Sequence, residues 1–277
     1  MDMTIPKDYE NQILAWRAEK YDALVRENGW LALAGLHWLK RGRNLIGSNP
    51  MCEIALPERA PTFLGLIEWK GGTLHFQAAE GVRVEVNGKL TRKTTLQSTK
   101  EATPSFITWH PSLRMVVHEH AGKYAVRVWD NTREERRSLP PLKWFPIEKR
   151  FRIPAKYTRH PDAQTGESPD TFGELVEDRV DGFITFKFEG TAYKLDVSET
   201  KEHTLFVKFR DATSGKETYP PCRYCYTEPV GDDGKLSLDF NFSYSPPCAF
   251  TPFATCIFAS PQNTLPFRVE AGEIYRA

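Results

Sequence analysis

Short segments in which apolar and polar residues alternate, separated by turn dipeptides, dominate the chain from about residue 43. Segments such as "VRVEVNGKL", "KYAVRVWD" and "GFITFKFEG" have the period of two that places every second side chain on one face of a sheet. Asn87-Gly88 and Gly71-Gly72 are turn signals between such segments. The polar, proline-containing residues 158–170 are the exception and are expected to form a mobile surface loop. Many short strands at this spacing predict a mainly β fold of sandwich-like or barrel-like modules.

The N-terminal residues depart from this pattern. Within residues 8–27, apolar side chains such as Ile13 and Trp16 recur near helical spacing, which predicts one amphipathic helix that stops before Gly29. A polar and then proline-rich stretch at 131–146 indicates a junction between modules. We therefore expect three parts: an N-terminal helical segment at 1–40, a first β module at 41–138 and a second β module at 139–277.

Composition and charge exclude several classes of protein. The chain of 277 residues has 37 basic and 36 acidic side chains and a net charge of +1. This balance provides no basic surface for nucleic acid and no attraction to an anionic membrane, so neither is an expected partner. No apolar run approaches the length of a membrane span, and the charged N-terminus does not resemble a secretion signal. The expected location is the cytoplasm.

The cysteines indicate either reduced thiols or a metal site. The five are Cys52, Cys222, Cys225, Cys248 and Cys256. The second module holds one CxxC pair, but its other two cysteines are too far apart in sequence for the second half of a zinc knuckle. We expect buried free thiols with no metal and no cofactor, and the alternative is structural zinc on Cys222, Cys225, Cys248 and Cys256. His118 and His120 share one face of a strand, but no third metal ligand is visible.

Two polar stretches of the second module predict a site for a small polar molecule. "RDATSGKE" follows an apolar strand, and "DFNFSY" alternates polar residues with Phe240 and Phe242. If the alternation continues, the phenylalanines face the core and the polar residues face a pocket. The expected ligand-binding residues are Arg210, Asp211, Lys216, Asp239, Asn241, Tyr244, Cys248, Thr251 and Glu270.

Roles follow from the chemistry of these side chains. Arg210 and Lys216 would hold an anionic group. Asp239 is the best candidate for a general base, because a carboxylate beside phenylalanines can have a raised pKa. Whether any reaction is catalysed stays open. The simpler alternative is an ordinary hairpin tip together with a phenylalanine-anchored loop that prolines stiffen.

Several motifs together resemble the domain of unknown function 1684 family. They are "GLHWLKRGRNLIGSNP", "VEVNGK", "KWFPIEKRFRI", "FRDATSGKETY" and "LDFNFSYSPPCAFTPFATC" with "PQNTLPFRVEAGE". The resemblance extends from about residue 29 to 276, and it implies no known activity. "PPCRYC" departs from the glycines that the family pattern has after "KETY".

The first β module also resembles forkhead-associated domains, which are β-sandwiches that read phosphothreonine. "LIGSNPMCEIALP" and "VEVNGK" carry this likeness. Ser48 stands where the resemblance requires the phosphate-binding Arg, and a serine cannot provide charge-assisted contacts. This module therefore suggests an alternative function, the docking of a protein partner without phosphothreonine reading.

Overall fold

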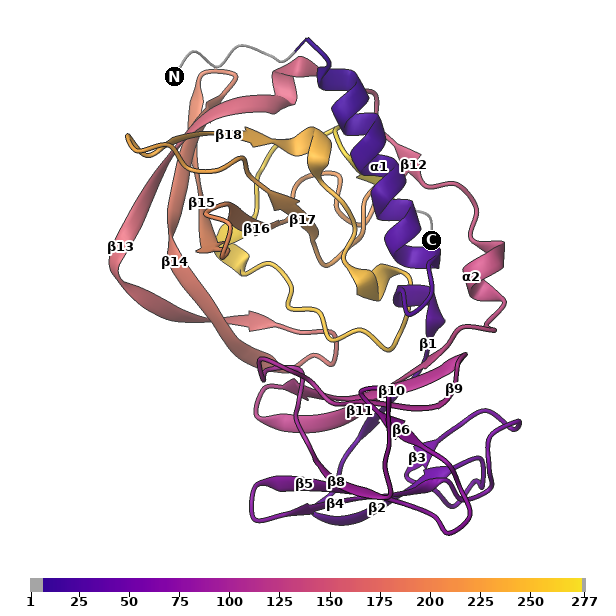
Figure 1. Ribbon diagram of the computed structural model, residues 1–277. Coiled ribbons are helices and arrows are strands. Elements are labelled where there is room, and N and C mark those ends of the chain that lie inside the picture. Colours follow the sequence, from indigo (N-terminus) through magenta and orange to yellow (C-terminus); the bar gives the residue numbers. More distant parts are fainter. Residues whose placement is uncertain (1–6, 276–277) are drawn as a thin grey trace. The chain divides into compact units, whose positions relative to one another are not determined.

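The computed structural model describes residues 7–275 and divides the chain into two compact units. One unit extends from Ala23 to Leu139, and the other joins the residues up to Asp22 to those from Pro140 onward. Most named elements are strands, with helix α1 (Tyr9–Val25) at the N-terminal end, which confirms the predicted mainly β fold (Figure 1). The residues of α1 up to Asp22 thus fold with the second β module rather than forming a separate segment.

The unit from Ala23 to Leu139 packs two sheets around one core. The first sheet has the order β1-β11-β10-β9-β6-β7, with β1 (Leu33–Trp38), β6 (Glu85–Val86), β7 (Lys89–Leu90), β9 (Phe106–His110), β10 (Leu113–His120) and β11 (Lys123–Asp130). The second has the order β3-β2-β4-β5-β8, with β2 (Gly42–Gly47), β3 (Ile54–Ala55), β4 (Gly65–Lys70), β5 (Thr73–Ala78) and β8 (Lys93–Leu96). Short helices η1 (Trp30–Ala32) and α2 (Glu135–Ser138) complete it.

Sequence alternation explains how this core forms. In β10, Met115 and Val117 are fully buried and pack in one cluster with Ile67 and Phe76 of the other sheet. The predicted turn between β6 and β7 is present, and Asn87 and Gly88 both have positive φ, as a two-residue hairpin turn requires.

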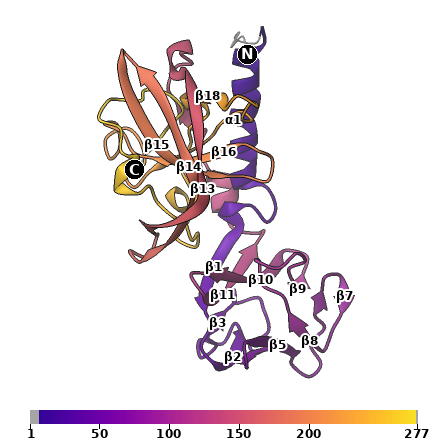
Figure 2. The same cartoon turned by 90° about the vertical axis from the view of Figure 1, so that its left-hand side faces the viewer.

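The other unit is built on one curved sheet of order β17-β16-β15-β14-β13-β18. Its strands are β13 (Arg152–Pro169), β14 (Leu175–Phe188), β15 (Thr191–Glu199), β16 (Leu205–Phe209), β17 (Arg223–Tyr226) and β18 (Lys235–Asp239). A small sheet pairs β12 (Lys143–Trp144) with β19 (Glu273–Ile274), and the helices besides α1 are η2 (Lys149–Phe151), η3 (Phe240–Phe242), η4 (Pro247–Ala249) and η5 (Pro261–Asn263). Figures 1 and 2 show β13 and β14 as long, bent strands.

The expectation of a mobile loop at 158–170 is wrong, because most of these residues belong to β13. The register between β13 and β14 shifts between Arg159 and Gln164, so a bulge accommodates the intervening residues. Pro161 lies in this bulge, where its missing N–H removes no ladder hydrogen bond. The bulge therefore allows a proline-containing segment to continue as a strand.

The core of this unit lies on one face of the curved sheet. Alternate residues of β14 and β16 are buried, including Ile184, Phe186, Val207 and Phe209, and they pack with Phe240. Among residues 7–275, no helix is both long and apolar enough to cross a bilayer.

Candidate functional site

The segment after β18 attaches helix α1 to its unit. The Asp239 carboxylate is 3% exposed and accepts hydrogen bonds from the Tyr9 hydroxyl at 2.7 Å and from the Asn241 backbone N–H at 3.0 Å. The Asn241 side-chain amide donates to the Tyr9 hydroxyl at 3.0 Å and to the Glu148 carbonyl oxygen at 2.9 Å. These bonds connect the first turn of α1, the end of β18 and the residue before η2.

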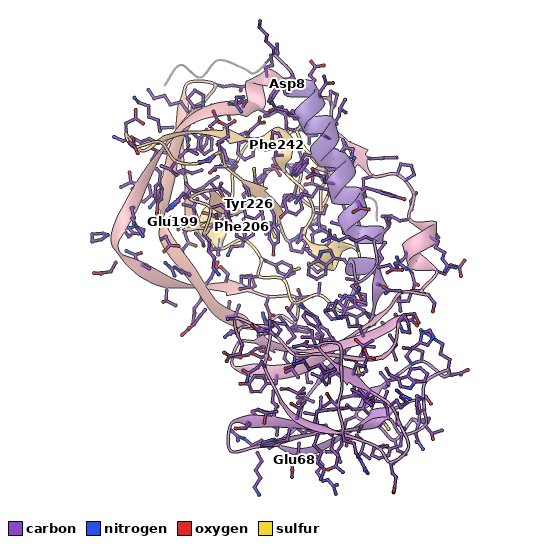
Figure 3. The ribbon with its side chains drawn as sticks, viewed as in Figure 1. Asp8, Glu68, Glu199, Phe206, Tyr226 and Phe242 are labelled. Carbon is purple, nitrogen blue, oxygen red and sulfur yellow. The ribbon has the colours of Figure 1, made fainter. Side chains whose placement is uncertain are left out.

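This geometry corrects one sequence expectation. Alternation would place Asp239 and Asn241 away from the core, but the strand ends at Asp239 and a 3₁₀ helix follows. Three residues complete a turn of such a helix, so side-chain directions no longer alternate. Phe240 is fully buried, as expected, but Asn241 is fully buried as well. Phe242 packs against Trp16 of α1 with ring centroids 5.2 Å apart (Figure 3).

The environment of Asp239 shapes its acid–base chemistry. Burial raises its pKa, whereas hydrogen bonds from Tyr9 and Asn241 and the nearby Arg152 guanidinium lower it. The Arg152 guanidinium nitrogen lies 3.6 Å from the carboxylate. The oxygens of the Asp239 carboxylate are thus engaged with protein groups inside the fold. This favours a structural role for Asp239 over that of a general base.

A second buried carboxylate organises the turn after β16. The Asp211 and Arg223 side chains have no solvent exposure and are 3.2 Å apart. Arg223 also donates to the carbonyl oxygens of Val269, at 2.9 Å, and Ala271. Asp211 accepts from the Val269 N–H at 2.7 Å and from the Thr213 hydroxyl at 2.9 Å. The pair fastens the predicted "RDATSGKE" turn to the C-terminal segment.

The other residues of the predicted site lie in different surroundings. Arg210 and Lys216 are exposed, and Glu270 is 41% exposed and forms an ion pair with an arginine at 3.0 Å. Tyr244 lies below the Lys20 ammonium, which is 3.9 Å from its ring centroid. The described contacts therefore do not gather the predicted residues around one cavity, and their role in ligand binding stays a prediction.

The proline-rich loop places two thiols beside each other. Helix η4 carries Cys248, and the buried Thr251 donates its N–H back into that helix. The Cys248 N–H points at the Cys256 sulfur, 3.4 Å away. The Cys256 N–H donates to the Thr171 hydroxyl at 2.8 Å, and that hydroxyl donates to the Cys256 carbonyl oxygen at 3.1 Å. The loop is consequently fixed on both sides of the thiol pair.

The two thiols differ in acidity. The Cys256 thiol lowers the pKa of Cys248, and the hydroxyls of Tyr219 and Thr171 lower that pKa further. Burial acts in the opposite direction and raises the pKa. The Tyr219 hydroxyl also lies 3.4 Å from the Cys248 carbonyl oxygen. The Cys248 thiol, together with burial, raises the pKa of Cys256. Cys248 is half-buried and Cys256 is buried.

The other two cysteines of this unit lie in the interior. The Cys225 thiol donates to the Asp239 carbonyl oxygen at 3.4 Å within the core, and burial raises its pKa to about 12. Cys222 has no exposure, and burial raises its pKa as well. Within residues 7–275 no group of three or more His, Cys, Asp or Glu side chains is placed to hold a metal ion.

The predicted features of the Ala23–Leu139 unit have local partners. The rings of His118 and His120 stack with centroids 6.2 Å apart, and burial lowers the pKa of His118 to about 3. The Thr99 hydroxyl lies 3.1 Å from the His118 Nδ1. The Ser48 hydroxyl donates to the Ala60 carbonyl oxygen at 2.9 Å.

Glu273, which sequence reasoning missed, supports the start of the proline-rich loop that carries Cys248 and Cys256, called here the thiol loop. Its carboxylate accepts from the Ser245 N–H at 3.0 Å, and its own N–H donates to the Ser243 carbonyl oxygen at 2.8 Å. Gly272 has φ +77°, and a Cβ there would lie 2.3 Å from that carbonyl oxygen, so glycine is required. Burial raises the pKa of Glu273 to about 7, although hydrogen bonds from Ser245 and the Arg223 charge lower it.

The same unit has a polar hollow of about 200 Å³ on strands β13 to β16 and helix η5. Phe206, which lies beside Tyr226 with ring centroids 4.8 Å apart, forms part of its wall (Figure 3). The other lining residues are Gln164, Thr165, Gly166, Glu167, Ser168, Asp178, Arg179, Val180, Asp196, Val197, Ser198, Lys208, Ser260, Gln262 and Asn263.

A buried ion pair stands in the wall of this hollow. The Lys208 ammonium donates to the Asp178 Oδ1, and the Ser168 hydroxyl donates to the Asp178 Oδ2 at 2.7 Å. Both residues of the ion pair are 8% exposed. The Asn263 amide donates to the backbone carbonyl oxygens of Lys208 and Asp196, each at 2.8 Å, and so fixes helix η5 against the sheet.

Sequence reasoning missed this ion pair, although a signal was present. Asp178 lies between Val176 and Val180 at a spacing of two, so it occupies an otherwise apolar face of its strand. Lys208 interrupts the apolar run "TLFVKF". Two opposite charges that each interrupt an apolar strand segment indicate a compensated buried pair.

Fold and site together define a mainly β protein in two units, with a polar hollow and a thiol pair in the unit that carries the C-terminal motifs. The model of the DUF1684 family, described as proteins of unknown function, matches residues 137–274. The chain belongs to this family. The motif around residues 35–50 lies outside the matched range.

Solved structures give further likenesses. An uncharacterised protein of Haloarcula marismortui is 31% identical over 51% of this chain and 80% of that chain, with a TM-score of 0.42. The FHA domain of FhaA, solved with the intracellular domain of Rv3910, is 16% identical over 34% of this chain and 96% of that one, with a TM-score of 0.24. A structure from an analysis of phosphothreonine-dependent FHA domain interactions matches equally weakly. A search of the curated proteins found no match.

The Asp239 network predicts a large loss of stability on truncation. Asp239→Ala should lower the free energy of unfolding by about 2–4 kcal/mol, because Tyr9, Asn241 and Arg152 lose their acceptor inside the protein. Tyr9→Phe should cost about 1–2 kcal/mol. Urea denaturation measures both, and Asp233→Ala on an exposed turn is the control with little expected change. An Asp239→Ala variant as stable as the control would contradict this account.

The buried Glu273 predicts a specific pH dependence. Glutamic acid in the unfolded chain ionises near 4.5 and Glu273 near 7, so the folded protein holds the extra proton between these values. The free energy of unfolding should therefore fall as pH rises from about 4.5 to 7. Glu273→Gln has no such carboxyl group, so its free energy of unfolding should not show this fall. Between about pH 4.5 and pH 7 the variant should therefore gain on the order of 3 kcal/mol of stability relative to the natural chain.

Urea denaturation at about pH 5 and about pH 8 measures the difference. Glu270→Gln is the matched control, because Glu270 is 41% exposed and its replacement should shift stability equally at both pH values. Parallel pH profiles for the natural chain and Glu273→Gln would refute the interpretation.

Proposed function

We propose that this protein binds a small polar molecule with an anionic group in the hollow beside Lys208. The observation that supports this most is the buried Lys208–Asp178 pair in the wall of the hollow. An ammonium group has three N–H donors, and Asp178 is the one acceptor for them among the described contacts. The remaining donors suit a carboxylate or phosphate oxygen.

Asp178 positions the lysine. Its second oxygen accepts the Ser168 hydroxyl, so the carboxylate is held in one orientation. The carboxylate in turn holds the Lys208 ammonium in the wall, which reduces the loss of side-chain entropy when a ligand binds. Serine, threonine and glutamine side chains elsewhere in the lining suit the hydroxyl groups of a small molecule.

The dimensions of the hollow limit the ligand. Liquid water occupies about 30 Å³ per molecule, so about 200 Å³ corresponds to at least about six water molecules. A hydroxylated carboxylic acid or a small phosphate ester has this size. The five unpaired cysteines support the cytoplasm as the compartment in which such a ligand is met.

The alternative, docking of a protein partner on the Ala23–Leu139 unit, has less support. The exposed large apolar side chains described there are Met51, Phe63 and Leu90. Met51 lies in a turn whose segment hydrogen-bonds to the segment of Phe63, Leu90 lies in β7, and three such side chains are few for an apolar docking centre. A docking surface of ordinary size normally has a contiguous apolar centre.

A thermal-shift screen with glycolate, glycerate, glycerol phosphate and inorganic phosphate tests the proposed function. At least one probe should raise the melting temperature of the natural chain and bind in calorimetry. Combining Lys208→Gln with Asp178→Asn keeps hydrogen-bonding groups and net charge but removes the ammonium. Affinity for that probe should fall by at least about tenfold, the equivalent of one lost charge-assisted bond.

Lys187→Gln is the matched control, because Lys187 is exposed on β14 and outside the lining. It should bind the probe like the natural chain. Equal affinity of the double variant and the natural chain would show that Lys208 does not hold the ligand. Failure of all four probes would remove the support for a small anionic ligand.

A further inference from the structure

The thiol pair in the proline-rich loop is separate from the hollow, whose lining contains no cysteine among the described residues. The Cys256 sulfur is 3.4 Å from the Cys248 backbone nitrogen, and the neighbouring thiols shift each other's pKa in opposite directions. A disulfide has an S–S bond of about 2.05 Å, and the contact between the Cys256 sulfur and the Cys248 backbone brings the two residues together within one loop. Both residues belong to the same unit, so no movement between units is needed.

The surroundings of the pair favour one thiol as the nucleophile. Cys248 is half-buried, and the Cys256 thiol and the hydroxyls of Tyr219 and Thr171 lower the pKa of its thiol, with the Tyr219 hydroxyl 3.4 Å from the Cys248 carbonyl oxygen. Donors placed around a sulfur stabilise its anion, which is the reactive form. Cys256 is buried behind it and keeps its proton, which suits a thiol that reacts second.

We propose that Cys248 and Cys256 form a reversible disulfide on reaction with a hydroperoxide. The Cys248 thiolate attacks the terminal oxygen, the O–O bond breaks, and the alcohol or water leaves with a proton, so that Cys248 becomes a sulfenic acid. The Cys256 sulfur then attacks the Cys248 sulfur, the S–O bond breaks, and water leaves with the Cys256 proton. Two thiols and one hydroperoxide thus give one disulfide, one alcohol and one water, and an external dithiol reverses the reaction.

The remaining cysteines lack this arrangement. Cys225 is fully buried in the core, and Cys222 has no exposure. Cys52 is half-buried in the other unit, and its thiol lies 3.7 Å from the Thr62 carbonyl oxygen, an acceptor rather than a donor. Cys52 is therefore an internal control for reactivity that depends on access alone.

Tryptic cleavage separates the Cys248–Cys256 pair from the other cysteines. Cleavage after Lys235 and Arg268 releases residues 236–268, which contain Cys248 and Cys256 and no other cysteine. The reduced full-length chain is treated with limiting hydrogen peroxide, quenched with iodoacetamide and digested. Mass spectrometry should find peptide 236–268 with two hydrogens fewer and no alkyl groups, and dithiothreitol should restore two alkylation sites.

Variants identify the order of the steps. Cys256→Ser should stop at the sulfenic acid on Cys248, which dimedone traps, and Cys248→Ser should give neither adduct nor disulfide. Cys222→Ser should form the disulfide like the natural chain. Circular dichroism establishes whether each variant is folded. If a variant does not fold, the disulfide found by mass spectrometry in the natural chain still tests the proposal.

Relative rates decide whether the site is specific. Peroxide should consume Cys248 at least about tenfold faster than Cys52, as expected for a sulfur surrounded by donors. Oxidation of Cys52 while peptide 236–268 keeps two free thiols would overturn the proposal. So would a disulfide that joins Cys222, rather than Cys256, to Cys248.

Discussion

Buried carboxylates hold the irregular C-terminal part of the second β module together. Asp211, Asp239 and Glu273 each accept a hydrogen bond from a backbone N–H that lies outside any strand. Backbone groups in such segments have no ladder partners, and burying them unpaired would be costly. The prolines of this region remove further donors and restrict the chain. Asp239 docks helix α1, Glu273 holds the segment that leads into the loop with Cys248 and Cys256, and Asp211 fastens the turn after β16 to the C-terminal segment.

Alternation in the sequence was sufficient to predict the fold class, because it is a local property that repeats along every strand. The helix at residues 9–25 and the burial of Phe240 followed from the same kind of reasoning. Such local reasoning could not predict the hydrogen bond from Tyr9 to Asp239. The two residues are 230 positions apart, and nothing in the nearby sequence identifies the partner. The strand end at Asp239 was missed, although its signal is local. The Asp239 side chain caps the following 3₁₀ helix by accepting from the Asn241 N–H.

The polar hollow lies in the module where the sequence predicted a site, but none of the predicted ligand-binding residues lines it. Polar residues near turns were given the binding role, yet Asp211 stabilises a turn and Asn241 is buried in the helix-docking network. The hollow instead uses Asp178 and Lys208, which lie within strands. From sequence alone, a charged residue within an apolar strand suggests that the register of the strand has been assigned wrongly. In the structure, the two charged residues instead pair with each other. Only the placement of neighbouring strands distinguishes the two cases.

Two buried ion pairs of this unit, Asp211–Arg223 and Asp178–Lys208, need different explanations. Arg223 satisfies two backbone carbonyl oxygens besides Asp211, so its charge is used to close the C-terminal segment. Lys208 has no comparable backbone partner among the described contacts, and its ammonium lies in the wall of a hollow. Apolar residues of similar volume often replace a buried ion pair without loss of stability. Stability therefore accounts for Arg223 but gives no structural reason for Lys208, and the ligand that we propose would supply one.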